Sequence, residues 1–181
     1  MKLKKLNANL SLLTLLLLLI HEGYQLYAYI TFYYNPMLTK VSGRAVVCCF
    51  ILHAIMSAIC VFALHDSKTI AYKKLNIRTV SQRVSAVMLL LLLPIHILSF
   101  PLLQSSAGGA GYVLVETVQI IYYAALSCHI SLSFSNSLVT LGRLTDIKKK
   151  RVIDIIVLAI CALLFIAVSV IITMIHTIII S

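Results

Sequence analysis

Four histidines, each in a different long apolar segment, are the residues of this sequence best suited to chemistry: His21, His53, His96 and His129. An imidazole in the hydrocarbon core of a membrane is costly, and ionisable residues there usually face the bundle interior and serve a function. Two imidazoles on opposite sides of a haem iron can supply its axial ligands, and helices of a bundle can present them. Four histidines on four helices therefore suggest two haems, each bound by a pair of histidines.

Small or hydroxylated residues share helix faces with these histidines. Ser133 follows His129 by one turn, and Ser85 precedes His96 by three turns. Such neighbours let a flat macrocycle approach the helix, and polar ones can hold the second imidazole nitrogen. We therefore predict that Ser85 and Ser133 help to bind the cofactor. The alternative for any one ring is a histidine that forms a hydrogen bond across a helix interface. The presence of four such histidines on four helices weakens this alternative.

The remaining candidate ligands are assigned to other roles. His65 abuts Asp66 at the end of the second apolar segment, where we expect a wet interface, and His176 lies near the outer end of the last segment. We assign no ligand role to either. The five cysteines all lie in apolar segments without CxxC spacing, and we interpret them as small packing residues.

The elements that must position these residues are membrane helices. The chain has 181 residues, of which 61% are hydrophobic and only 11% are charged, unlike a soluble domain. Apolar runs of the length that crosses a hydrocarbon core recur five times. We place them at residues 8–31, 45–64, 82–103, 112–140 and 153–178. The prediction is an all-α integral membrane protein, a five-transmembrane-helix bundle in which residues 1–181 form a single membrane domain.

The charges orient this bundle. Of the 15 Lys and Arg residues, 13 lie at the amino terminus or in the second and fourth connections, and only Lys40 and Arg44 lie on the other side. This positive-inside pattern predicts a cytoplasmic amino terminus and an outer carboxyl terminus, in a multi-pass protein of the cell inner membrane. Anionic lipid or an acidic cytoplasmic partner accounts for the basic face, so the net charge of +10 does not call for nucleic acid.

The distance of each histidine from the nearest inner charge indicates its depth in the membrane. At the rise of an α-helix, all four histidines fall roughly 18–24 Å from the cytoplasmic surface. We therefore expect the four histidines to lie at similar depths, which cannot decide how they pair.

The acids expected inside the membrane are Glu22, next to His21, and Glu116, near the outer start of the fourth segment. Glu22 is a candidate for proton exchange with a quinone, with a side chain that reaches the wet interface as the alternative.

The chain resembles the di-haem cytochrome b anchor of succinate:quinone oxidoreductases and fumarate reductases, most specifically in its third and fourth apolar segments. Gln-Arg-Val-Ser-Ala at residues 82–86, followed by His96, is similar to the Gln-Arg-(Val/Ile)-(Thr/Ser)-Gly motif that opens the third helix in that family, although Ala86 replaces the glycine. The run from His129 to Gly142 is similar to the fourth helix of the family, and residues 51–55 resemble the second more weakly.

The resemblance implies two b haems, one bound by His53 and His129 nearer the cytoplasm and one by His21 and His96. It also implies an iron–sulfur subunit and a flavoprotein subunit on the cytoplasmic side, with quinone as the membrane substrate. Arg83 would contact a haem propionate or the partner, with simple interfacial anchoring as the alternative. The chain itself would transfer electrons and anchor the complex, without a catalytic site.

Two other classes stay open. One is a di-haem b cytochrome of another membrane electron-transfer complex. The other is a haem-free membrane anchor or transporter whose histidines form hydrogen bonds between helices. A transporter would be expected to contain broken helices or internal repeats.

Overall fold

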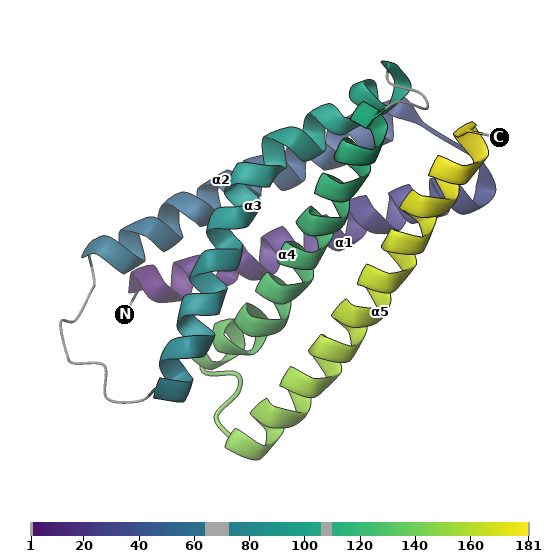
Figure 1. Ribbon diagram of the computed structural model, residues 1–181. Coiled ribbons are helices and arrows are strands. Elements are labelled where there is room, and N and C mark those ends of the chain that lie inside the picture. The colour runs from purple at the N-terminus through teal and green to yellow at the C-terminus, as the bar shows by residue number, and fades with distance from the viewer. Residues whose placement is uncertain (1, 64–72, 106–109, 181) are drawn as a thin grey trace. The chain divides into compact units, whose positions relative to one another are not determined.

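The computed structural model describes residues 2–63, 73–105 and 110–180, and this part of the chain contains helices without strands (Figure 1). The helices are α1 (Lys2–Thr31), α2 (Pro36–Ala63), α3 (Lys73–Ser105), α4 (Ala110–Thr140) and α5 (Ile147–Ile180). Each contains a stretch long and apolar enough to cross a membrane. The predicted all-α class and the five spans are therefore confirmed, and the chain is a multi-pass membrane protein by helix length and composition.

The helices extend beyond their apolar runs. Every helix begins two to nine residues earlier than the sequence analysis placed it, whereas every helix ends within two residues of the expected position. Hydropathy marks only the apolar part of a helix, but the backbone continues to satisfy its own hydrogen bonds through polar residues at the end. The early start of α3 places Lys73 and Arg78 inside the helix, whereas hydropathy alone predicts them in the connection before it.

Large apolar side chains cover the outside of these helices. Leu91 on α3, Leu114 on α4 and Leu163 on α5 are each more than 60% exposed. Buried positions, in contrast, include several polar side chains: Thr14, Ser85, Ser99, Gln119 and Ser135. Apolar residues outside and small polar residues inside are the arrangement expected where lipid, rather than water, surrounds the helices.

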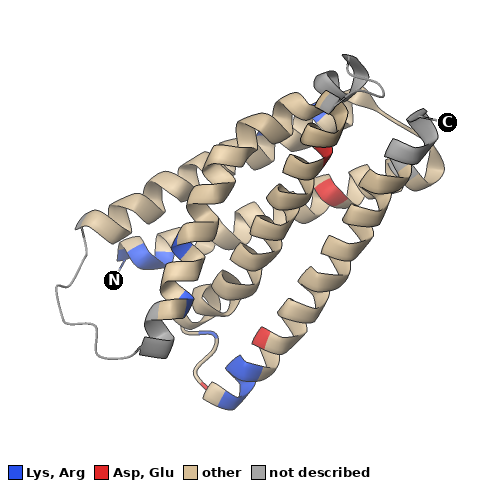
Figure 2. Ribbon diagram, in the orientation of Figure 1, with Lys and Arg blue, Asp and Glu red and all other residues tan. Residues whose placement is uncertain are grey.

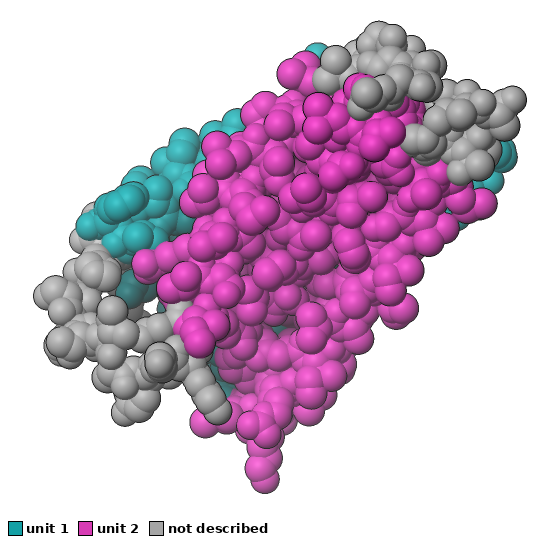
Figure 3. All heavy atoms as spheres, viewed as in Figure 1, with its two compact units in different colours: residues 1–69, 136–145 teal, residues 70–135, 146–181 magenta. Residues whose placement is uncertain are grey.

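The chain divides into two compact units, which Figure 3 colours separately. Unit 1 comprises Met1–Thr69 and Asn136–Thr145, and unit 2 comprises Ile70–Ser135 and Asp146–Ser181. In unit 1, α1 packs against α2. In unit 2, Arg78 of α3 donates hydrogen bonds to Leu132 of α4 and to Asp154 of α5. The single membrane domain inferred from the sequence stays a prediction.

Local signals end and begin the helices of unit 1. Phe32 adopts a positive φ of 56° directly after α1, and the Asn35 side-chain oxygen then accepts hydrogen bonds from the backbone N–H groups of Met37 and Leu38. Asn35 therefore caps the amino end of α2. After α4, Gly142 has φ 76°, the left-handed conformation with which many helices end, and for which glycine has no steric penalty.

Basic residues concentrate at helix ends. Figure 2 shows most Lys and Arg positions at the start of α1, at the start of α3, and around the start of α5, with long uncharged stretches between. This distribution agrees with helices whose middles cross a membrane.

Candidate functional site

Each of the four predicted ligand histidines lies half-buried on its own helix. His21 on α1 and His53 on α2 belong to unit 1, whereas His96 on α3 and His129 on α4 belong to unit 2. Each predicted haem pair thus takes one histidine from each unit. The contacts within a unit report how each ring is held, and the pairing itself stays a prediction.

In unit 1, the ring of His53 faces a polar pair on the neighbouring helix. Its Nδ1 lies 3.0 Å from Oδ1 of Asn7, and the amide nitrogen of Asn7 donates to Oγ of Ser57 at 3.1 Å. Asn7 therefore links two α2 residues that are one turn apart. With the amide oxygen directed at the ring, the imidazole carries its proton on Nδ1, which leaves the lone pair on Nε2.

The ring of His21 is held by a hydroxyl. Its Nδ1 lies 3.0 Å from Oγ of Ser42 on α2, and that hydroxyl donates its own proton to the carbonyl of Leu38 at 2.7 Å. The hydroxyl is then an acceptor toward the ring, so Nδ1 again carries the proton. A Cβ atom added at Gly43 would lie 3.2 Å from Cε1 of His21, so glycine is what lets α2 approach this ring.

In unit 2, the ring of His129 faces the backbone of α3. Its Nδ1 lies 3.1 Å from the carbonyl oxygen of Gln82 and 3.2 Å from Oγ of Ser85, which itself donates to the Gln82 carbonyl at 3.0 Å. A carbonyl oxygen can only accept, so the proton of this imidazole is on Nδ1. Ser85, which the sequence grouped with His96, is buried and contacts His129 instead.

The ring of His96 has both its nitrogen and its face in contact with α4. Nδ1 lies 2.7 Å from Oε1 of Gln119, the shortest of these contacts. The ring stacks on Tyr122, with centroids 4.3 Å apart and planes 13° from parallel, and it meets the edge of Tyr123 at 5.8 Å. Gln119 is 5% exposed, and its amide nitrogen has no acceptor within the described residues.

The two histidines of each unit lie at different levels. Because Asn7 faces His53 and Ser42 faces His21, the levels in unit 1 are 14 residues apart on α1 and 11 on α2, roughly 16–21 Å along the helices. In unit 2, the corresponding contacts are 11 residues apart on α3 and 10 on α4, or roughly 15–17 Å.

The expectation of similar depth is therefore wrong within each unit. That expectation assumes that the basic residues nearest to the histidines all lie at one depth, but paired helices do not end at the same level. His53 faces Asn7, only two residues beyond Lys5, while α2 continues for ten residues past His53.

The other predicted site residues occupy varied positions. Arg83 is exposed on α3, and Glu22 is half-buried on α1. The hydroxyl of Ser133 donates to the carbonyl of Ile130 in its own helix at 3.5 Å. His65 lies outside the described residues. Within the described part of the chain, no three His, Cys, Asp or Glu side chains gather as a metal site, although a haem iron needs only two imidazoles from the protein.

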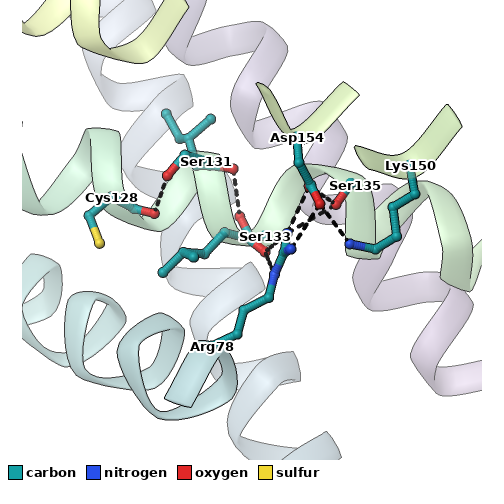
Figure 4. Close-up of polar contacts among 9 residues, drawn as sticks. Arg78, Cys128, Ser131, Ser133, Ser135, Lys150 and Asp154 are labelled. Atoms are coloured by element: carbon teal, nitrogen blue, oxygen red, sulfur yellow. Dashed lines mark hydrogen bonds and ion pairs between the residues drawn. The ribbon is translucent and has the colours of Figure 1, made fainter. Parts of the chain in front are cut away.

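A charged cluster that the sequence analysis missed joins α3, α4 and α5 within unit 2 (Figure 4). The Arg78 guanidinium donates to both carboxylate oxygens of Asp154, at 2.9 and 2.8 Å, and also to the carbonyl of Leu132. Oγ of Ser135 donates to Oδ1 of Asp154 at 2.5 Å, and Lys150 donates to Oδ2 at 2.9 Å. The carboxylate thus accepts four hydrogen bonds.

The expectation that Glu22 and Glu116 are the acids inside the membrane is wrong, because it omits Asp154. Asp154 lies in the apolar stretch of α5, and Arg78 lies in that of α3. The spacing of Lys150 and Asp154, four residues apart at the start of a helix, is the signal that could have found it. Arg78 gave no such signal, because its partner is on a helix far along the chain.

Comparisons of the chain with models of protein families, with curated proteins and with solved structures give no match.

Proposed function

We propose that this chain is the membrane-anchor cytochrome b subunit of a succinate dehydrogenase or fumarate reductase, with two b haems that pass electrons between an iron–sulfur subunit and quinone. One observation carries the proposal. All four predicted ligand histidines direct Nδ1 at an oxygen acceptor on a neighbouring helix, at 2.7–3.1 Å. Histidines that bind metal through Nε2 characteristically donate Nδ1–H to such an acceptor, which fixes the tautomer and the ring orientation.

The two levels support the predicted pairing. The positive-inside pattern favours a cytoplasmic amino terminus, and each span reverses the direction of the chain. His53 faces the start of α1, and His129 faces the early part of α3, so both belong to the cytoplasmic level. His21 and His96 then belong to the outer level. The levels of the contacts, the positive-inside orientation and the alternating direction of the spans thus support the pairing of His53 with His129 and of His21 with His96.

The polar groups of this chain would give the haems their setting. Haem would supply the one-electron chemistry when bound, and the four imidazoles would hold its iron. Asn7, Ser42, Gln82 and Gln119 orient the four rings through Nδ1. We further propose Arg83 and Glu22 as contacts to a propionate or the cytoplasmic partner and to quinone, respectively, in a cell inner membrane. The iron–sulfur and flavoprotein subunits would bind the basic cytoplasmic face.

A haem-free membrane protein is the second candidate. The observation in its favour is that the same four contacts join helices within each unit, as interhelical hydrogen bonds do in membrane proteins without cofactors. A di-haem cytochrome of another electron-transfer complex would share the ligand arrangement and differ in its partner.

The test is a spectrum of the purified protein, reduced with dithionite and compared with the oxidised form, with haem quantified as its pyridine haemochrome. Two b haems per chain are expected, and a protein without haem would refute the proposal. His53→Ala and His129→Ala should remove the same spectral component, and His21→Ala and His96→Ala the other. His176→Ala, a histidine without a predicted ligand role, is the matched control and should retain both.

The partner is tested separately. Succinate oxidation or fumarate reduction by the complex that copurifies with the chain would support the succinate dehydrogenase or fumarate reductase assignment. Two haems without this activity would leave a b cytochrome of another complex.

A further inference from the structure

We infer that Gln119 is a positioning residue for His96 and sets the reduction potential of the haem that His96 binds, an inference that rests on the proposed haem function. The first support is the contact itself. The side-chain oxygen of Gln119 lies 2.7 Å from Nδ1 of His96, closer than the acceptors of the other three rings. This oxygen belongs to a flexible side chain. Its position beside the imidazole is therefore not dictated by the helix backbone.

The second support is the cost that Gln119 bears in this orientation. Its amide nitrogen is buried and has no acceptor within the described residues, although the residue is only 5% exposed. A buried donor without an acceptor destabilises the fold. Gln119 thus directs its oxygen at the imidazole at the expense of its own nitrogen, which indicates that the contact with His96 is the reason for a glutamine at this position.

The third support is that a second contact fixes the ring plane. A hydrogen bond to Nδ1 leaves the imidazole free to rotate about the axis of that bond. The stack of His96 on Tyr122 at 4.3 Å removes this rotation, because the two planes lie 13° from parallel. Side chains of α4 therefore specify both the proton and the plane of the His96 ring.

The chemical consequence follows from electron donation. An acceptor at Nδ1–H raises the basicity of the imidazole, and a more basic ligand stabilises the ferric over the ferrous iron. The Gln119 contact therefore lowers the potential of the outer haem. Loss of such an outer contact typically costs about 10–100-fold in metal affinity or activity, and we take a tenfold change in the redox equilibrium as the expected scale. For a one-electron couple, a tenfold change in equilibrium corresponds to about 59 mV.

The experiment is a redox titration of the purified protein, monitored optically and by electron paramagnetic resonance. Gln119→Met keeps the size of the side chain but removes the acceptor. We expect the redox equilibrium of one haem to shift about tenfold toward the reduced form, which raises its reduction potential by about 59 mV. Gln119→Glu retains an acceptor oxygen and should leave that potential unchanged or lower it. Tyr122→Leu should change the resonance spectrum of the same haem, whereas Tyr122→Phe, which keeps the ring, should not.

The matched control is Thr117→Ala, which removes an exposed hydroxyl of α4 that donates to the carbonyl of Val113 in its own helix, and which should leave the outer haem unshifted. Unchanged potentials in Gln119→Met, or equal shifts of both haems, would overturn the inference while the haem function stands. Loss of the haem in both Gln119 variants would also overturn it, because the side chain would then only hold helices together. Absence of haem from the unmodified protein would instead refute the proposed function.

Discussion

Replacement of Asp154 by alanine is expected to destabilise the protein more than any other single change in the charged cluster of unit 2. The carboxylate accepts two hydrogen bonds from Arg78, one from Ser135 and one from Lys150. The carboxylate is on α5. Its removal therefore breaks the hydrogen bonds that link α5 to Arg78 on α3 and to Ser135 on α4.

The magnitude follows from the burial of the partners. Removal of one member of a fully buried ion pair costs about 3–5 kcal/mol, because the other charge remains without compensation. Here the side chains of Arg78 and Asp154 are 27% and 23% exposed, and Arg78 retains the carbonyl of Leu132. We therefore expect the lower end of this range, about 3 kcal/mol. Lys150→Ala removes a single contact between residues four apart on one helix and should cost about 1 kcal/mol or less.

The assay is reversible unfolding of the detergent-solubilised protein by increasing fractions of sodium dodecyl sulfate. A loss of about 3 kcal/mol lowers the folding equilibrium constant by about a hundredfold. Arg83→Ala is the matched control. It changes an exposed arginine of α3, the helix that carries Arg78, and should cost about 0.5 kcal/mol or less. A double-mutant cycle of Arg78→Ala and Asp154→Ala should show a coupling free energy above about 1 kcal/mol.

Two results would refute this reasoning. One is an Asp154→Ala variant that is no less stable than Arg83→Ala. The other is additivity of the two alanine substitutions in the cycle, which would mean that the guanidinium and the carboxylate do not stabilise each other in the folded protein.

Three further changes test the fold. Gly43→Ala places a Cβ atom 3.2 Å from His21 and should lower stability by about 1–3 kcal/mol, whereas Gly23→Ala, with open space around it, should be neutral or stabilising in the same unfolding assay. Asn35→Ala removes the cap of α2 and should cost about 1 kcal/mol by the same measurement. Alkaline phosphatase fused to the carboxyl terminus should be active and a fusion to the amino terminus inactive, and the reverse pattern would contradict the proposed orientation.

The spans could be predicted because a membrane helix is a property of one segment of sequence. Long apolar runs specified where each helix ends, but not where it begins, since hydropathy does not register the polar first turns. The connection before α3 illustrates the consequence. Hydropathy places Arg78 in the connection, although the residue lies inside α3 and donates to an α5 carboxylate.

The partners of the histidines could not be predicted because they depend on the register between two helices. Nothing in the spacing of Asn7 or Gln119 along their own helices marks them as acceptors for His53 and His96. Ser85 shows the same limit. It shares a helix with His96, but the antiparallel packing of α3 and α4 brings it to His129.

Once the register is known, a regular pattern appears in the sequence. Each of the first four helices carries an oxygen acceptor and, 10 to 14 residues later, a histidine: Asn7 and His21, Ser42 and His53, Ser85 and His96, Gln119 and His129.

Because the helices of each pair run antiparallel, this order makes the contacts reciprocal, and the acceptor of one helix meets the histidine of the other. A lone interhelical hydrogen bond needs no such order. An acceptor 10 to 14 residues before a histidine recurs in α1–α2 and in α3–α4. This recurrence is what the two haem levels of the proposed function would require, and the haem spectrum tests that proposal directly.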